Sequence, residues 1–405
     1  MTNKSRKPRI FYLAWTPPTT NGGACLAMHR HFVLRDDFDV FVASSSPFQN
    51  LKIPSLHLQR HPAMIRLSNT RFCRLVRQFE MTVEPYWFLR QVESSLHKFR
   101  PDVIFTVPDN TLSWTAYLLA KKTGLPFITN FQDWWPKGQF TLPLEKPYLP
   151  VRSLLEHRFH RMYEASEIAF CTSAGMKQKL GAHSNAPVLY PCPAPRDLKF
   201  QPDFKTPSPE KPLRLIYAGT IIDAYGRSVL SLAKALRSKK EFEFHVYGPH
   251  PDWPEEDRAW MEAEGVYRGL VPHEELKVKL YEADVCLVVM SSEPQLRMMM
   301  ETSFTTKFLE YSQYGKPIVV WGPEYCQPVQ VANTLQAGVS VTSPKAEAVI
   351  DTLYNLREIP HWKKLAEGAW NAANNIFDPD QIHSILNRSI RVLLEHESVE
   401  TYEGS

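Results

Sequence analysis

The sequence predicts an α/β protein built from two doubly wound, parallel-sheet domains, and three observations support this class. The chain has 405 residues, of which 43% are hydrophobic, enough for two packed cores. Strand-like apolar runs alternate with helical patterns over residues 9–173, and the alternation starts again at residue 213. Between the two series, residues 190–212 are dense in proline and poor in apolar side chains, which is typical of a boundary. We therefore expect one domain over residues 1–195 and a second over residues 205–375.

The first domain follows the order strand, helix, strand. Short runs of β-branched and aromatic residues predict the strands, and amphipathic stretches predict the helices. Gly22 and Gly23 form a tight turn between the first strand and the first helix. The predicted strands are 9–15, 40–44, 102–107, 126–130 and 168–173, and the predicted helices start at Ala24 or cover 111–123 and 151–165.

The second domain repeats this order. Gly219 and Gly248 close its first two strands, and glycine turns of this kind suit a parallel sheet whose ligand binds at the carboxyl ends of the strands. The predicted strands are 213–219, 242–248, 283–289 and 318–321, and the predicted helices are 228–237, 274–282 and, at the end of the chain, 381–395.

Residues 303–321 are the most informative segment. Phe304, Phe308 and Tyr311 share one helical face, and residues 305–307, Thr-Thr-Lys, lie on the first turn of the helix. A helix start with two hydroxyls and a lysine favours an anion such as phosphate. The alternative is an ordinary capped helix packed on a sheet.

Charge and cysteine content exclude some classes of protein. A net charge of +4 is too weak to argue for a nucleic-acid partner. The six cysteines are scattered without metal-ligand spacing, so we expect free thiols in a reducing compartment. No apolar run has the length of a signal-peptide core or a membrane span, and we therefore expect a soluble, cytoplasmic protein.

Positive charge is concentrated in residues 51–100, which hold nine Lys or Arg against three Glu. Within this block, a helical pattern over residues 66–83 has two interpretations. In the first, the helix packs its apolar side into the domain and leaves its arginines in solvent. In the second, the arginines bind anionic lipid headgroups at the inner face of a membrane. The apolar positions are Phe72, Leu75, Val76, Phe79 and Val83, and the arginines beside them are Arg71, Arg74 and Arg77.

Several of these segments resemble retaining GT-B-fold glycosyltransferases of the group 1, family-4-like kind. Residues 303–320 are similar to the stretch S-F-P-T-K-L-F-E-Y-L-A-x-G-K-P-V-V of these nucleotide-sugar enzymes. The resemblance implies two Rossmann-like domains facing across a cleft, with the last helix, over 378–396, packing back on the first domain. It extends through both halves, in the segments Asn21-Gly-Gly23, 132–136, 156–176, 217–219, 247–248 and 269–284.

In this family the second half binds the donor. A nucleotide-diphosphate leaving group gains negative charge as the glycosidic bond breaks, so its site needs N–H donors and cations. The resemblance assigns Glu310 to the ribose hydroxyls. The candidate donor residues are Gly22, Gly23, Gly219, Tyr247, Gly248, Leu270, Val271, Ser303, Thr305, Thr306, Lys307 and Glu310.

Two positions depart from the family pattern. The family's basic residue near the start of the first helix of this domain is replaced by Tyr225, and we take Arg227 as a substitute; the alternative is a solvent-exposed arginine. The family's first glutamate corresponds to Thr302, with Glu301 beside it. Glu301 and Thr302 are therefore the candidates for contact with the donor sugar.

On the acceptor side, the segment 132–136 points to Asp133. A carboxylate there could orient or deprotonate an acceptor hydroxyl, while Trp134 or Trp135 stacks on a sugar ring. The alternative is a capping aspartate followed by two core tryptophans. No Asp-x-Asp motif is present, so we expect no metal, and no cofactor beyond the nucleotide sugar as co-substrate.

The resemblance therefore implies transfer of a hexose-type sugar from a UDP- or GDP-linked donor to a glycan or lipid-linked acceptor, as in polysaccharide biosynthesis. It also implies retention of configuration. Two alternatives stay open at this point: a sugar-nucleotide epimerase with the same fold, and a nucleotide-sugar-binding protein without catalysis.

Overall fold

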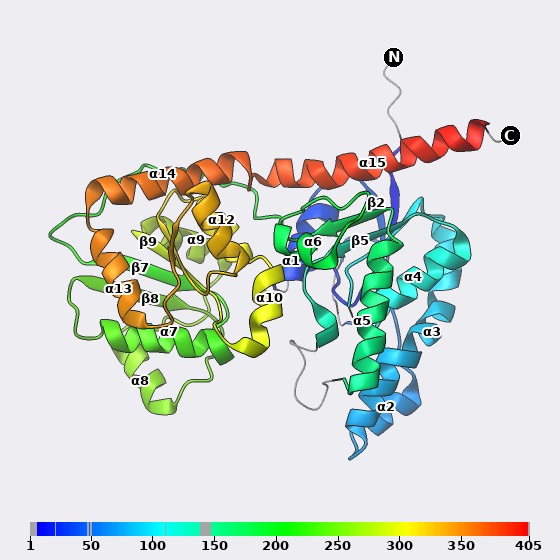
Figure 1. The fold of residues 1–405 in the computed structure, drawn as a ribbon, viewed down its shortest axis with the longest axis horizontal. Helices are drawn as coiled ribbons and strands as arrows, with labels where there is room; N and C mark the ends of the chain where they lie inside the picture. Colours follow the sequence, from blue (N-terminus) through cyan, green and yellow to red (C-terminus); the bar gives the residue numbers. More distant parts are fainter. Residues whose placement is uncertain are drawn as a thin grey trace. The chain divides into compact units, whose positions relative to one another are not determined.

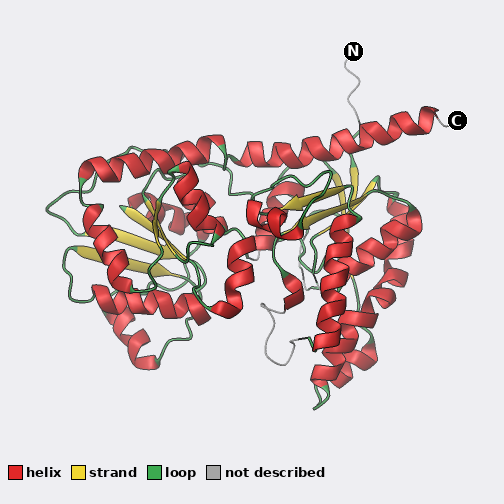
Figure 2. Ribbon diagram, in the orientation of Figure 1, coloured by secondary structure: helices red, strands yellow, loops and turns green. Residues whose placement is uncertain are grey.

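The computed structural model describes residues 6–20, 22–46, 48, 51–109, 111–137 and 147–403. The chain divides into two compact units (Figure 1). Unit 1 comprises Met1–Cys192 and Ile382–Ser405, and unit 2 comprises Pro193–Gln381. Each unit is an α/β structure with its own parallel sheet and with helices on both sides of that sheet (Figure 2).

The sheet of unit 1 has six strands in the order β3-β2-β1-β4-β5-β6, and all neighbours are parallel. Every residue of β4, β5 and β6 is buried, because helices cover both faces of a parallel sheet and leave no polar face to the solvent. The strands are β1 (Arg9–Leu13), β2 (Asp39–Ser44), β3 (Ser55–His57), β4 (Val103–Thr106), β5 (Phe127–Phe131) and β6 (Ile168–Cys171).

The helices of unit 1 connect these strands. The last of them, α15, comes from the far end of the chain. They are α1 (Gly23–Phe32), α2 (Pro62–Ser68), α3 (Cys73–Phe99), α4 (Leu112–Thr123), the short η1 (Trp135–Lys137), α5 (Leu149–Glu164), α6 (Ala174–Leu180) and α15 (Pro379–Glu403).

Helix α15 packs on unit 1 through one apolar stripe and one polar contact. Its buried stripe is Ile382, Leu386 and Ile390, at the spacing of one helical face. His383 Nδ1 lies 3.1 Å from His31 Nδ1, and its Nε2 lies 3.0 Å from Asp37 Oδ2. Burial lowers the pKa of His31 well below its usual value, so this contact favours a neutral imidazole.

Unit 2 has a five-stranded parallel sheet in the order β11-β10-β9-β7-β8. Its strands are β7 (Leu213–Ala218), β8 (Phe242–Tyr247), β9 (Val285–Val289), β10 (Ile318–Trp321) and β11 (Val339–Val341). Its helices are α7 (Asp223–Leu236), α8 (Glu255–Ala263), α9 (His273–Glu282), α10 (Arg297–Thr302), α11 (Thr306–Ser312), α12 (Gln327–Leu335), α13 (Ala346–Asn355) and α14 (Ile359–Asn375), with the short turns η3 (Leu198–Phe200) and η4 (Pro294–Leu296).

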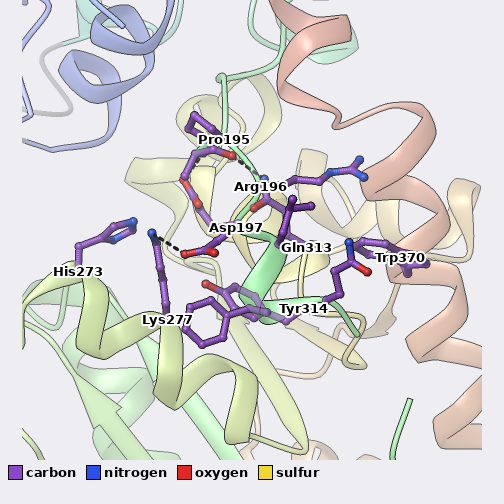
Figure 3. A pocket seen from close by; sticks show the side chains of 13 residues that line it. Pro195, Arg196, Asp197, His273, Lys277, Gln313, Tyr314 and Trp370 are labelled. Carbon is purple, nitrogen blue, oxygen red and sulfur yellow. Dashed lines mark hydrogen bonds and ion pairs between the residues drawn. The ribbon is translucent and has the colours of Figure 1, made fainter. Parts of the chain in front are cut away.

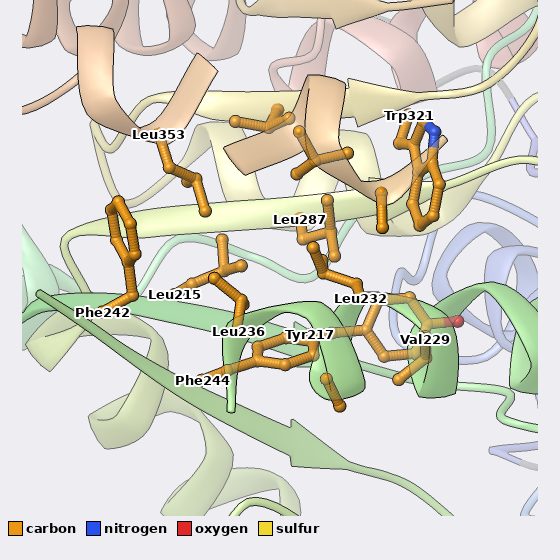
Figure 4. Packing of buried hydrophobic residues seen from close by; sticks show 14 of the residues in the cluster. Leu215, Tyr217, Val229, Leu232, Leu236, Phe242, Phe244, Leu287, Trp321 and Leu353 are labelled. Carbon is orange, nitrogen blue, oxygen red and sulfur yellow. The ribbon is translucent and has the colours of Figure 1, made fainter. Parts of the chain in front are cut away.

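Alternate residues of the strands build the core of unit 2 (Figure 4). Leu215 and Tyr217 of β7 point to the face that α7 covers with Val229, Leu232 and Leu236. The neighbouring strands add Phe244, Leu287 and Trp321 to this face, and α13 adds Leu353. In this layer, every second residue of the strands packs against residues of α7 that are three or four positions apart.

The proline-rich segment after residue 192 packs into unit 2. Arg196 Nη2 donates to Ala373 O over 2.6 Å and lies 3.0 Å from Asp378 Oδ2. The ring of Phe200 lies 5.7 Å from that of Tyr281. The two units divide between Cys192 and Pro193, within the predicted boundary region of residues 190–212, and these side chains hold the rest of that region on unit 2.

The first half of α3 differs from its predicted packing. Of the predicted apolar positions only Val76 is buried, and Phe72, Leu75, Phe79 and Val83 are exposed. The face that α3 buries is set by the rest of this long helix, through Met81, Pro85, Phe88, Val92 and Leu96. One helical turn before Met81, the same face contains residues 77–78. Residues 75 and 79 lie on a different side of the helix.

Candidate functional site

In unit 2, the carboxyl ends of β7 and β8 approach each other through two glycines. The Gly219 N–H donates to Tyr247 O over 2.9 Å. A Cβ atom at Gly248 would lie 2.2 Å from Gly219 O, so no larger residue fits there without a shift of the backbone. Gly219 has φ +144°, a conformation that side chains disfavour. The two predicted glycines therefore lie together at this edge, and Tyr247 contributes its backbone while its side chain is buried.

The loop after Gly269 joins the same edge. The Gly248 N–H donates to Gly269 O over 3.0 Å, and Gly269 has φ +72°. Leu270 is 77% exposed, and Val271 is half-buried. An exposed apolar side chain beside two backbone turns could cover one face of an aromatic base.

Lys307 extends from α11 across the end of β7. Its Nζ lies 5.7 Å from the centre of the Tyr217 ring, and a Cβ atom at Gly219 would lie 2.7 Å from this Nζ. Burial lowers the pKa of the ammonium to about 8. Among the described residues no carboxylate pairs with it. A desolvated cation without a counter-ion is costly unless an anion binds to it.

Tyr311, one turn further along α11, fixes this helix to the strand. Its hydroxyl accepts from the Ala218 N–H over 2.9 Å and donates to Ala218 O over 3.0 Å. The sequence analysis assigned Tyr311 only to the apolar face. This contact spans 93 residues, so no local pattern could have indicated it.

The start of α11 is capped by a side chain, and the backbone N–H of Ser303 just before it is already hydrogen-bonded. Thr305 is the N-cap, and its Oγ1 accepts from the Lys307 N–H over 3.3 Å. Thr306 is the first residue of the helix. The Ser303 N–H donates to Met299 O over 2.8 Å, so this amide is not offered to a ligand.

The candidates for the donor sugar lie on α10. Thr302 is buried, and its hydroxyl donates to Met298 O over 2.7 Å. Glu301 is partly exposed and accepts from Arg297 Nε over 2.7 Å. The side-chain contacts that both residues make within α10 hold this helix together.

Arg227 lies on the exposed side of α7, where it forms an ion pair with Glu293. This carboxylate raises the pKa of the guanidinium. A phosphate would have to replace Glu293 at this arginine, whereas Lys307 has no such competitor among the described residues.

Glu310 faces a small cavity of about 140 Å³ within unit 2 (Figure 3). Its Oε1 accepts from the Ala194 N–H over 3.2 Å, and Gln313 donates to Ala194 O over 2.9 Å. The figure shows Asp197 and Lys277 directed toward each other, with Nζ and Oδ2 3.6 Å apart. Glu310 therefore helps to hold the segment that follows Pro193, a role that the sequence did not indicate.

In unit 1, Gly22 and Gly23 begin α1 after β1. Gly22 has φ +86°, and a Cβ atom on it would meet nothing within 4 Å. Among the described residues no side chain caps this helix, and the N-terminus of a helix favours an acceptor or an anion. Asn21, the first residue of the predicted glycine loop, lies outside the described residues.

Asp133 and the tryptophans follow β5. Asp133 is half-buried. Trp134 is only 4% exposed and packs against Phe159 and His160, with ring centres 5.1 and 5.6 Å apart. Trp134 is thus a core residue and is not available to an acceptor, as one alternative of the sequence analysis held.

Trp135 instead pairs with Trp15, which the sequence analysis did not select. Their ring centres lie 5.9 Å apart at 76°, and Trp15 is 46% exposed. Buried Asp109 holds the backbone of Trp15 by accepting from its N–H over 3.0 Å. Two indole rings therefore meet at the carboxyl edge of this sheet, where a ligand can reach at least one of them.

Other features of the described residues bear on the class of site. All six cysteines are free, as predicted. The described part of the chain contains no cluster of His, Cys, Asp or Glu arranged to hold a metal ion. None of its helices combines the length and the apolar character that crossing a bilayer requires.

Comparison with known proteins identifies the fold. Residues 29–189 match the model of the glycosyl transferase 4-like domain. No match to a curated protein was found by sequence. Sucrose-phosphate synthase from Thermosynechococcus elongatus is 14% identical with a TM-score of 0.68, covering 96% of this chain and 100% of that one.

Two further solved structures have a similar fold over nearly the whole chain. The HepE protein of Anabaena, in complex with UDP and glucose, is 13% identical with a TM-score of 0.62, covering 95% of this chain and 100% of that one. WaaG, a glycosyltransferase involved in lipopolysaccharide biosynthesis, is 14% identical with a TM-score of 0.56, covering 93% and 99%. The chain therefore has the GT-B fold of glycosyltransferases, with two Rossmann-like parallel-sheet units and a match to the glycosyl transferase 4-like domain in the first.

Proposed function

We propose that this protein is a cytoplasmic glycosyltransferase that moves a hexose-type sugar from a UDP- or GDP-linked donor to a glycan or lipid-linked acceptor. The proposal includes retention of configuration at the anomeric carbon, as the family resemblance implies. It also includes a reaction without a metal ion, in which the protein's own cation and N–H groups bind the diphosphate.

The observation that carries the proposal is Lys307. Its ammonium lies over Gly219 at the end of β7 and has no carboxylate partner among the described residues, and burial lowers its pKa. A bound diphosphate would supply the missing counter-charge. It would also strengthen this contact as the glycosidic bond breaks and the leaving phosphate gains charge.

The surrounding residues suit a nucleotide. Gly219 and Gly248 carry no side chain that would block a phosphate beside Lys307, and Leu270 offers an apolar surface to the base. Glu310 lies three residues after Lys307 on α11, and we assign it to the ribose hydroxyls. The UDP in the HepE structure supports a nucleotide donor for a chain of this fold.

On the acceptor side, we assign Asp133 to the attacking hydroxyl. In the transfer, the acceptor oxygen forms a bond to the anomeric carbon while the bond from that carbon to the diphosphate oxygen breaks. The hydroxyl proton leaves to a base, which is Asp133 or the departing phosphate. Trp135 and Trp15 would contact the apolar face of the acceptor sugar.

The test compares two lysines of unit 2, Lys307→Met and Lys316→Met. Burial lowers the pKa of both, so exchange for methionine should leave the melting temperature of either variant equal or higher. Only Lys307→Met should weaken binding of the nucleotide sugar, by about 1.5–3 kcal/mol, or roughly tenfold to a hundredfold in Kd. Calorimetric titration with UDP- and GDP-sugars measures this difference.

Equal donor affinity in the wild type and a folded Lys307→Met variant would remove the lysine from the donor site. Release of free UDP or GDP only in the presence of an acceptor separates transfer from epimerisation. Donor binding without turnover on extracted glycans and lipids would identify a binding protein instead.

A further inference from the structure

Helix α3 carries an exposed row of large apolar side chains on unit 1. The row, which we call the apolar stripe, consists of Phe72, Leu75, Phe79, Val83 and Tyr86, and these residues are 42–49% exposed except for Leu75, at 57%. Their spacing of three and four residues places them on one side of the helix, over about 21 Å at 1.5 Å per residue. A contiguous row of this kind is uncommon on a soluble surface and marks an interaction site.

Helix α2 extends the same surface. None of its residues is buried, and Ile65 and Leu67 are exposed. Figure 1 shows α2 beside the first turns of α3 at one end of unit 1. Close by, Tyr148 precedes α5, and its ring lies 4.4 Å from the Arg74 guanidinium.

Along α2 and the first half of α3, the exposed charge has one sign. The only acidic residues between 61 and 92 are Glu80 and Glu84, and both are buried. Arg60 and Arg77 form ion pairs with Glu80, the latter over 2.9 Å. Arg60 Nε also lies 3.9 Å from Glu84 Oε1, so both buried carboxylates are paired with arginines and add little negative charge to the surface.

The remaining arginines face outward. Arg66, Arg71 and Arg74 are exposed, and within the described residues none of them forms an ion pair; Arg71 and Arg74 lie over the rings of Phe72 and Tyr148. Long arginine side chains beside an apolar row can keep their charge at the level of lipid phosphates while the row enters the acyl region.

We propose that the apolar stripe and these three arginines form a docking surface for a membrane that contains anionic lipids. Charge complementarity selects this partner, because a bilayer surface offers apolar depth under a layer of phosphates. A second copy of the chain would bring the same three arginines together, and like charges in contact oppose association. The inference goes beyond the proposed function, since lipid binding needs neither donor nor acceptor.

The experiment is co-sedimentation with vesicles of phosphatidylcholine alone or mixed with phosphatidylglycerol, without any nucleotide sugar. The wild type should bind the mixed vesicles, bind them less at high salt, and bind the neutral vesicles weakly. The triple variants Phe72→Ser/Leu75→Ser/Phe79→Ser and Arg66→Gln/Arg71→Gln/Arg74→Gln should each lose affinity by about tenfold or more.

Matched controls use similar residues elsewhere on unit 1. Leu34→Ser/Ile385→Ser/Val392→Ser removes three apolar side chains of comparable exposure, and Lys98→Gln/Lys121→Gln/Lys177→Gln removes three exposed charges. Both controls should bind as the wild type does. Thermal unfolding of each variant establishes that it is folded.

Three results would overturn the proposal. The wild type could fail to bind mixed vesicles, or the stripe variants could bind as tightly as their controls. Sedimentation velocity without lipid could also reveal a dimer that Phe72→Ser/Leu75→Ser/Phe79→Ser dissociates, which would make a second copy the occupant of the stripe.

Discussion

The carboxyl edges of the two parallel sheets hold opposite chemistry. At the edge of unit 2, two turns without side chains, at Gly219 and Gly248, lie together, and Lys307 adds a cation. At the edge of unit 1, Trp15 and Trp135 meet beside a segment that carries Asp133. One fold, used twice in one chain, thus carries an edge with two glycine turns and a lysine, and an edge with two tryptophans and an aspartate.

The comparison shows where function is encoded in such a protein. The sheets have the same parallel build and similar buried strands, so the scaffold alone does not distinguish the units. The distinction lies in the few residues that follow each strand. We expect changes at one edge to affect donor binding and changes at the other to affect transfer or acceptor binding.

The largest expected effect is at Asp133. Asp133→Asn keeps the size of the side chain and removes its charge, so transfer should fall by about 10²-fold or more, the scale for loss of an acid–base group. Donor affinity and the melting temperature should not change, because the donor is assigned to the other edge. Single-turnover rates and a donor titration measure the two quantities. Wild-type turnover in this variant would return Asp133 to a structural role.

The next effect is the pH dependence of donor binding. The pKa of Lys307 is about 8, so affinity for a nucleotide sugar should be constant below that pH. Above it the ammonium loses its proton, and affinity should fall by about tenfold per pH unit. Lys307→Arg stays charged and should flatten the profile. Parallel profiles for the two proteins would show that another group titrates.

The smallest expected effect is on acceptor binding at the aromatic edge of unit 1. Trp15→Ala should raise the KM for the acceptor by roughly twofold to tenfold, the scale of about 0.5–1.5 kcal/mol for an aromatic contact, with donor affinity unchanged. Trp87→Ala is the control, since Trp87 is also an exposed tryptophan of unit 1. An equal change of KM in both variants would contradict a specific contact at Trp15.

Much of the fold could be predicted because its signals are local. Buried parallel strands such as Ile318–Trp321 are short apolar runs, and the N-cap Thr305 precedes its helix directly. The three-residue strands β3 and β11 were missed because so short a run has no pattern of its own. The first interpretation of residues 66–83, in which their apolar side packs into the domain, was wrong. It rested on this segment alone, whereas the whole length of α3 decides which face is buried.

The residues of the candidate site also fall into those that local sequence indicates and those that only the tertiary structure reveals. The glycines and Lys307 are recognisable from their neighbours in sequence. The pairing of Trp15 with Trp135, and the contact of Tyr311 with Ala218, join residues that are distant in the chain. Trp134 and Trp135 are adjacent and of one type, so only the tertiary structure could tell which of them is buried.

The contact between His383 and His31 also affects how the molecule is made. Unit 1 needs residues from Ile382 onward to cover His31 and the apolar surface beside it, yet the ribosome delivers these residues only after all of unit 2. While the second unit is synthesised, the nascent first unit therefore lacks the side chains that bury His31 in the complete structure. A chain truncated before Ile382 would lack this cover for His31, so unit 1 can bury this part of its core only after unit 2 has been translated.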